Sequence, residues 1–273
     1  MGLQNLADLL FKRGRLEPAI EAMEQGLATY RRVLGNESTY VAGGLNTLAV
    51  LLRNSERYEE AEAAFQEALE LRTRLLEPNH PSVARTASNL AVVKMELGEF
   101  PQARKLLGQA LDILQQGLGP HHPSVVPSLL KLGELKLRQE KGAEAKEAYQ
   151  QALDLARQAL GPEHPHAASA MLGLGRVELQ RGNPQQAEDS IREALAIRQV
   201  RLAEGHWKLA EAKSWLGQSL VGQQRFAEAE SWLLEGRNDL AAARGEQHSA
   251  TRAADERLEK LYLASSRSLR PTP

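Results

Sequence analysis

Apolar residues recur every three or four positions along most of the chain, and the pattern itself repeats. Between residues 167 and 181 they stand at Ala170, Met171, Leu174, Val177 and Leu179. After a break at Gly182-Asn183-Pro184, a second stripe runs from residue 187 to residue 197. Spacing of this kind is typical of a helix with one face in a core. We therefore predict two amphipathic helices, A and B, in this segment.

The breaks between the stripes carry helix-start signals. Asn183 is suited to cap helix B, and Pro184 to occupy its first turn, where a missing N–H costs little. Helix A follows His164-Pro165, which we interpret as a cap and a first-turn proline. The equivalent places elsewhere hold His80-Pro81, His122-Pro123 and the conventional cap residue Ser38.

The two-helix unit recurs with a period of 42 residues, as at Leu76, Leu118 and Leu160. Units that pack only on their neighbours form an open-ended solenoid, whose size depends on the number of repeats. We predict a single solenoid over residues 1–263 and a flexible tail at 264–273. Its units are expected at about 1–33, 34–75, 76–117, 118–159, 160–201 and 202–243, with a capping helix at 247–263.

The order of small and large residues resembles that of tetratricopeptide repeats. Leu174-Gly175, Gly182, Ala187 and Ile191 follow one another as they do in that family. The 42-residue length and the Leu-Gly-Pro-x-His-Pro joints resemble the kinesin light chain type. The resemblance implies an all-α, right-handed superhelical solenoid of helix pairs. It also implies protein binding, since such arrays bind peptides on cargo adaptors and similar ones occur in bacterial signalling proteins, including serine/threonine kinases.

By the same resemblance, helices A line a concave groove, and the ligand-facing residues flank the Leu-Gly or Leu-Ala pair. An asparagine amide both donates and accepts hydrogen bonds, which suits it to hold a peptide backbone. Arginine and lysine could pair with acidic side chains or a C-terminal carboxylate, and a tryptophan could seat an apolar anchor. The predicted peptide-binding residues are Asn5, Asn46, Arg85, Asn89, Lys131, Glu134, Arg138, Arg176 and Trp215.

Several of these features also have a purely structural interpretation. Glu96 and Glu134 could neutralise the basic residues and leave only a solvated face. Leu172 could turn inward and belong to the core. The pair Gly43-Gly44, inside a helix A, indicates either a tight helix contact or room for a ligand against the backbone. The sequence leaves these alternatives open.

Composition and charge argue against other classes of function. The formal net charge of -1 lacks the excess expected for binding nucleic acid or an anionic membrane. No apolar run reaches the roughly 20 residues that span a bilayer. The absence of cysteine removes thiol chemistry and Cys-based zinc sites. His80, His122 and His164 stand one repeat apart, which is too sparse to ligate one metal ion.

No nucleophile, acid–base pair or phosphate-binding glycine loop gathers at one place in the sequence. We therefore predict a non-enzymatic cytoplasmic scaffold without a cofactor, which binds an extended peptide or a partner helix in its groove. The expected state is a monomer or weak homo-oligomer. The alternatives are a self-associating structural element and a regulatory segment of a larger bacterial signalling protein, such as a serine/threonine kinase.

Overall fold

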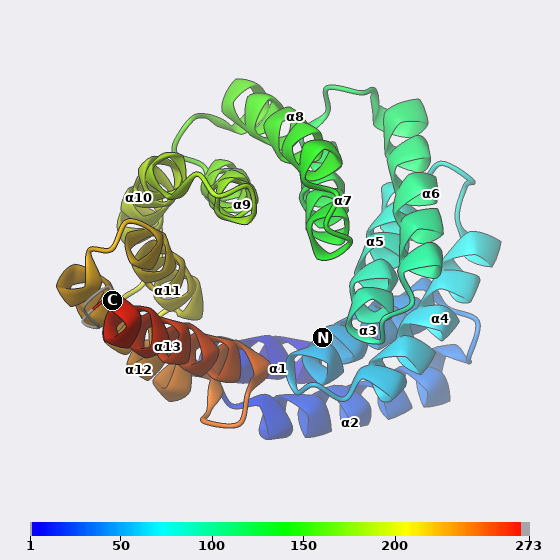
Figure 1. The fold of residues 1–273 in the computed structure, drawn as a ribbon. Coiled ribbons are helices and arrows are strands. Elements are labelled where there is room, and N and C mark those ends of the chain that lie inside the picture. Colours follow the sequence, from blue (N-terminus) through cyan, green and yellow to red (C-terminus); the bar gives the residue numbers. More distant parts are fainter. Residues whose placement is uncertain (1, 269–273) are drawn as a thin grey trace. The chain divides into compact units, whose positions relative to one another are not determined.

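A computed structural model describes residues 2–268, in which helices and turns are the only regular structure (Figure 1). The helices are α1 (Gly2–Lys12), α2 (Leu16–Leu34), α3 (Thr39–Asn54), α4 (Tyr58–Leu75), α5 (Pro81–Glu96), α6 (Phe100–Leu118), α7 (Val126–Arg138), α8 (Gly142–Leu160), α9 (Pro165–Gln180), α10 (Pro184–Arg201), α11 (Trp207–Gly222), α12 (Phe226–Arg244) and α13 (Ser249–Ser268). A short 3-10 helix, η1 (Pro123–Val125), leads into α7. The predicted all-α fold is confirmed.

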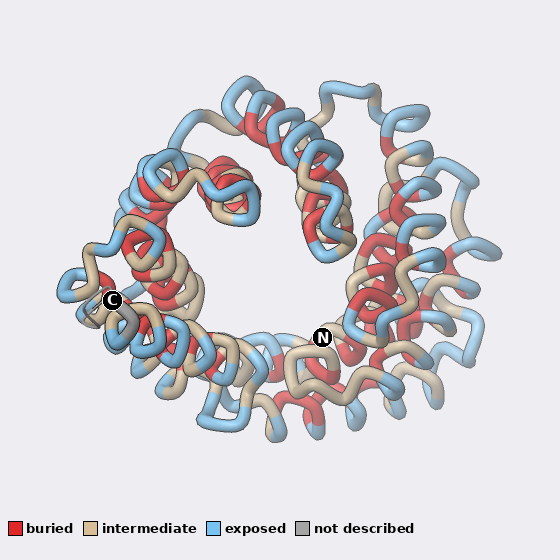
Figure 2. Tube along the Cα trace, viewed as in Figure 1, coloured by how far each residue is buried: buried red, intermediate tan, exposed pale blue. Residues whose placement is uncertain are grey.

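Helices that follow one another in the chain pack against one another. Within pairs, α1 packs on α2, α3 on α4, α5 on α6, α9 on α10 and α11 on α12. Between pairs, α2 packs on α3, α4 on α5, α8 on α9, α10 on α11 and α12 on α13. Each unit therefore has a layer of odd-numbered helices and a layer of even-numbered helices, and buried residues lie where the layers meet (Figures 1 and 2).

The chain divides into two compact units, Met1–Leu135 and Lys136–Pro273, with the boundary inside α7. One continuous array over residues 1–263 stays a prediction. A repeat that contacts only its neighbours does not contribute to a single central core. Buried apolar residues accordingly form separate clusters, one around Phe65, one around Leu107 and one around Leu240.

The turn between helices A and B places one residue in the left-handed backbone region in every repeat. The six positions, each 42 residues after the last, are Gly14, Glu56, Gly98, Glu140, Gly182 and Gln224, with φ between 59° and 79°. Residues with a β-carbon adopt this conformation at a cost of roughly 1 kcal/mol. Three repeats keep the turn without glycine, so packing of the two helices outweighs the local preference there.

Histidine caps begin most of the helices A. The Nδ1 atoms of His80, His122 and His164 each accept a hydrogen bond of 3.1 Å from the N–H two residues later, as predicted. Ser38 caps α3 in the same way, accepting from the Tyr40 N–H at 3.2 Å. Two further caps of 3.1 Å, at His206 and His248, are not among the predicted ones, because no proline follows those histidines.

Asn183 does not cap α10 with its side chain, contrary to the prediction. Its Nδ2 instead donates to Glu178 Oε2 at 2.8 Å. Glu178 is buried, and a buried carboxylate needs donors. Lys146 supplies another at 2.8 Å, and these bonds keep the pKa of Glu178 low although burial raises it.

The last helix is longer than predicted, since α13 ends at Ser268 and not at residue 263. Residues 264–268, assigned to a flexible tail, are therefore helical. The hydroxyls of Ser265 and Ser266 bond to the carbonyl oxygens of Tyr262 and Leu263, both at 3.1 Å, and no glycine or proline interrupts the chain before Pro271. Residues 269–273 of the predicted tail lie outside the described residues.

Candidate functional site

Two adjacent positions on each helix A have different surroundings. The first is buried where Ser88, Leu172 and Ser214 occupy it, and half-buried at Leu130. The second carries Asn89, Lys131 and Trp215, which are half-buried and line cavities. Leu172 is thus core, which settles the alternative that the sequence left open. Gly173, which the resemblance also assigns to the groove, is buried as well, because a β-carbon there would overlap the ring of Tyr149.

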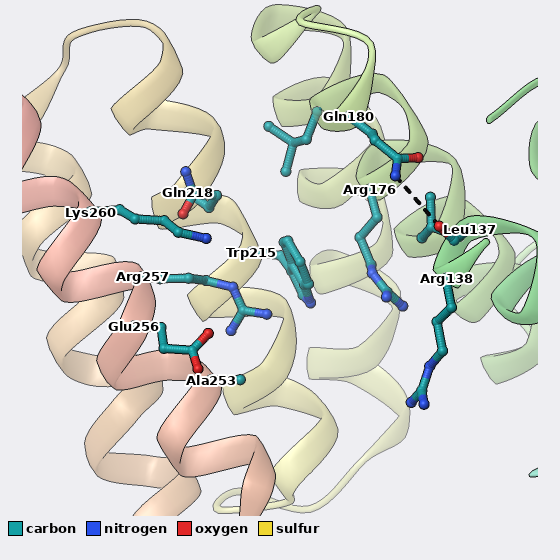
Figure 3. A pocket seen from close by; sticks show the side chains of 11 residues that line it. Leu137, Arg138, Arg176, Gln180, Trp215, Gln218, Ala253, Glu256, Arg257 and Lys260 are labelled. Atoms are coloured by element: carbon teal, nitrogen blue, oxygen red, sulfur yellow. Dashed lines mark hydrogen bonds between the residues drawn. The ribbon is translucent and has the colours of Figure 1, made fainter. Parts of the chain in front are cut away.

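Three predicted residues, Arg138, Arg176 and Trp215, line one cavity of about 410 Å³ in the second unit (Figure 3). They come from α7, α9 and α11, all helices A, and α13 closes the cavity on another side. The remaining lining residues are Leu137, Leu179, Gln180, Gln218, Ala253, Glu256, Arg257 and Lys260. The predicted groove face therefore does contain a concave site in this unit.

The indole of Trp215 lies between two guanidinium groups (Figure 3). The Arg257 guanidinium carbon is 3.7 Å from the ring centroid, and that of Arg176 is 4.9 Å away. Both distances are within the range of cation–π attraction. Arg257 also donates to Ser214 Oγ at 3.1 Å, which fixes its head group. Burial, with repulsion from Arg176, lowers the pKa of Arg257 to about 10, so the group is charged at neutral pH.

The lining of this cavity is mostly positive. Arg138, Arg176, Arg257 and Lys260 contribute four cations, and Glu256 contributes the one carboxylate among the lining residues. Gln218 adds a buried Oε1 atom that accepts no hydrogen bond from the described part of the chain. A flat ring, several cations and an available acceptor suit an extended acidic peptide, whose backbone N–H groups also need acceptors.

Arg257 and Lys260 lie outside the predicted site, because the last helix is predicted only as a cap. The 42-residue period nevertheless indicates these two positions. Arg257 stands 42 residues after Trp215, and Lys260 stands 42 residues after Gln218. These residues occupy the groove positions of a seventh helix A, and they supply half of the cations in the cavity.

Three other predicted residues, Arg85, Asn89 and Lys131, line a cavity of about 330 Å³ in the first unit. Lys131 Nζ donates to Asn89 Oδ1 at 2.8 Å. Burial, with repulsion from Arg53, lowers the pKa of Lys131 to about 7. Uncharged lysine is therefore substantially populated at neutral pH, and an anion in this cavity would favour the protonated form.

The last three predicted residues line neither cavity. Asn5 is exposed on α1, and Glu134 is half-buried on α7. Asn46 Oδ1 accepts from Thr86 Oγ1 at 3.3 Å and from Arg72 Nη1 at 3.5 Å, so its amide oxygen joins neighbouring helices. Six of the nine predicted residues thus line two cavities, each within one unit.

Gly43 and Gly44 differ in their surroundings, and each agrees with one of the two interpretations, a tight helix contact or open space against the backbone. A β-carbon at Gly44 would lie 3.3 Å from side-chain atoms of Leu27 and Met23, so this glycine permits a tight helix contact. A β-carbon at Gly43 would meet no atom within 4 Å, so the second glycine leaves open space. Of the two glycines, only Gly44 lies against side chains of a neighbouring helix.

Within residues 2–268, no set of three histidine, aspartate or glutamate side chains is placed to hold a metal ion. The same part of the chain contains no helix whose length and apolar character would let it cross a bilayer.

Family models described as tetratricopeptide repeat match nearly the whole chain. One matches residues 40–116, 82–141 and 124–199, which together exceed half of the sequence, and two others match residues 2–40 and 210–235. The chain belongs to the tetratricopeptide repeat family. Members of this family are in general non-catalytic scaffolds for protein interactions. Comparison with curated proteins finds no significant match.

Solved tetratricopeptide repeat structures show the same fold at low sequence identity. BtubC (BKLC) from P. vanneervenii is 23% identical, with a TM-score of 0.64 over 86% of this chain and 94% of that one. A putative kinesin light chain with nearly identical TPR-like repeats from Podosopora anserina is 24% identical, with a TM-score of 0.60 over 73% and 94%. The apo form of RapI is 14% identical, with a TM-score of 0.63 over 94% and 98%. The predicted resemblance to kinesin light chain repeats is confirmed.

Proposed function

We propose that this tetratricopeptide repeat chain is an interaction scaffold whose second unit binds an acidic, extended peptide segment of a partner protein. The peptide lies along helices A, with an acidic side chain or a C-terminal carboxylate at the Trp215 cavity. The observation that carries the proposal is the Trp215 ring held between Arg176 and Arg257 in a concave site whose lining has four cations and one carboxylate.

Physical chemistry favours an anionic peptide at this site over a neutral one. The guanidinium fork of arginine binds a carboxylate through two parallel hydrogen bonds, which fixes orientation as well as charge. Arg257 is already ordered by Ser214 and Trp215, so its side chain loses little entropy when a ligand arrives. The indole offers a rigid apolar surface beside these charges.

Fluorescence titration of Trp215 tests the proposal. Trp207→Phe with Trp232→Phe leaves Trp215 as the single tryptophan, and oligoglutamate serves as the probe. We expect its emission to change on titration with oligoglutamate, and Arg257→Met to weaken the affinity about tenfold, as loss of a charge-assisted contact should. The affinity should also fall as salt is raised.

Oligoglutamine and a distant arginine are the matched controls. Arg157 lies on α8, outside the cavity, in a 3.0 Å ion pair with Glu193, so Arg157→Met should leave the affinity unchanged. If oligoglutamine bound as tightly as oligoglutamate, or if Arg157→Met weakened binding as much as Arg257→Met, the cavity would not be the site of recognition.

A second candidate function, self-association, has a specific observation in its favour on α1. Leu6 is 44% exposed and Leu9 is 47% exposed, whereas the equivalent residues one repeat later, Leu48 and Leu51, are 8% and 2% exposed. The first helix thus presents leucines whose equivalents in the next repeat are buried. We propose that a second copy of this chain covers them.

A further inference from the structure

Two buried arginines link helices B to the start of the following helix A. Arg72 Nη1 donates to the Ser82 carbonyl oxygen at 3.1 Å and also to Thr86 Oγ1. Arg198 Nη1 donates to the Lys208 carbonyl oxygen at 2.5 Å, again ten residues ahead. The two arginines are 6% and 3% exposed, so their side chains fill the space between the helices.

The two repeats between them lack this arginine and have Leu114 and Ala156 in its place. One period after Arg72 the chain has Leu114, which lines the 330 Å³ cavity of the first unit. Arg72 contacts Asn46, Ser82 and Thr86. The residues 42 positions after these three are Ser88, Ser124 and Ser128, and all of them line the same cavity. The cavity therefore occupies the place that Arg72 fills one repeat earlier, because leucine is too short to fill it.

The groups that surround the cavity are mainly hydrogen-bond donors and cations. Arg85 and Lys131 bring positive charge, Asn89 brings an amide, and Pro81, Pro127 and Leu114 form an apolar wall. Four serines bring hydroxyls, and two of these, Ser88 and Ser128, bond to each other at 2.8 Å. None of the lining residues is acidic. Arg53 and Arg72 add positive charge nearby, and Glu96 lies close to Arg53.

We infer that this cavity binds the phosphate group of a phosphorylated ligand between the Arg85 guanidinium and the Lys131 ammonium. A tetrahedral dianion can neutralise both cations and accept from more donors than the two oxygens of a carboxylate can. The apolar wall leaves room for the carbon atoms that carry the phosphate. The inference goes beyond the acidic-peptide groove and does not depend on it, since every lining residue lies in the first unit.

Calorimetric titration with inorganic phosphate, O-phosphoserine and acetate tests the inference. We expect both phosphate ligands to bind with a Kd below about 10 mM and more tightly than acetate. Tighter binding of O-phosphoserine would identify a phosphorylated side chain as the source, and equal binding would identify free phosphate. The absence of phosphate binding, or tighter binding of acetate, would overturn the inference.

Leu114→Arg separates the cavity from general charge attraction. The new side chain should fill the cavity as Arg72 does and weaken phosphate binding at least about tenfold, although it adds a positive charge. If Leu114→Arg bound phosphate as well as the wild type does, attraction to the charged surface would explain the binding. Lys105→Met, at an exposed position on α6, is the control for loss of a charge and should bind as the wild type does. Circular dichroism verifies that each variant is folded.

The pH dependence of sulfate binding tests the role of Lys131, since sulfate keeps a fixed charge near neutrality. A lysine with a pKa of about 7 loses most of its charge between about pH 6 and about pH 8, so the affinity should fall up to about tenfold. Lys131→Arg should bind sulfate with an affinity that stays constant over this range, because arginine stays protonated. An affinity independent of pH in the wild type would overturn the assignment of Lys131.

Discussion

At the scale of single residues, one backbone position carries six different residue types over seven repeats. Its occupants, 42 residues apart, are Asn5, Thr47, Asn89, Lys131, Gly173, Trp215 and Arg257. Gly173 admits the ring of Tyr149, Lys131 bonds to Asn89, and Arg257 lies over Trp215. The repeat keeps the backbone constant, so recognition can change from unit to unit without a change of fold.

Lys131 should make the stability of the first unit depend on pH. Because its folded-state pKa of about 7 lies below the ordinary value of 10.5, the unfolded chain binds more protons between these pH values. The loss of stability caused by burying this charge is complete below about pH 7 and disappears as the pH rises to about 10.5. Lys131→Met should therefore raise the free energy of unfolding at about pH 6 by roughly 1–3 kcal/mol, with a gain that shrinks towards high pH. Urea denaturation at several pH values measures this change in the free energy of unfolding.

Lys213 provides the matched comparison for this test. It pairs with Asp239 at 2.6 Å and with Glu235 at 2.7 Å, and these partners raise its pKa. Lys213→Met should therefore destabilise the protein at about pH 6, which is the opposite sign. Equal effects of the two substitutions would contradict the account of Lys131.

At the scale of helices, one side-chain cap fixes the start of most helices A. The sequence pattern predicts this role for Ser38, His80, His122 and His164, because a cap residue precedes each apolar stripe. The pattern also predicts Asn183 as the cap of α10, a helix B, and this prediction is wrong, because the amide bonds instead to the buried carboxylate of Glu178. A tertiary partner of this kind is invisible in local sequence.

Replacing the cap of α5 should test how much one such bond contributes. His80→Ala removes the acceptor for the Ser82 N–H and should lower the free energy of unfolding by about 1 kcal/mol. His80→Ser should restore most of the loss, since a serine caps α3 through the Tyr40 N–H. Thermal denaturation followed by circular dichroism compares the three proteins. If serine were no better than alanine, histidine would act by packing and not by capping.

At the scale of the whole molecule, the fold was more predictable than the sites. A solenoid makes its contacts between neighbours in sequence, so a 42-residue period suffices to predict helix pairs and their order. The cavities depend on side chains that several helices bring together, as Arg138, Arg176 and Arg257 are. They also depend on side-chain length, as with Leu114 in the place of Arg72. Periodicity identifies such departures, but only coordinates show that they leave space.

The exposed apolar residues of α1 lead to a prediction about assembly. Leu6 and Leu9 occupy positions that most later repeats bury, so contact between two copies would remove this surface from water. Each buried leucine contributes roughly 1.5–3 kcal/mol, which is enough for weak association at high protein concentration. We expect the mass from light scattering to rise with concentration in the wild type and to stay monomeric in Leu6→Glu with Leu9→Glu. Leu234→Glu, at another exposed leucine, should associate as the wild type does. A wild type that remains monomeric throughout would exclude self-association and leave the acidic-peptide groove as the proposed function.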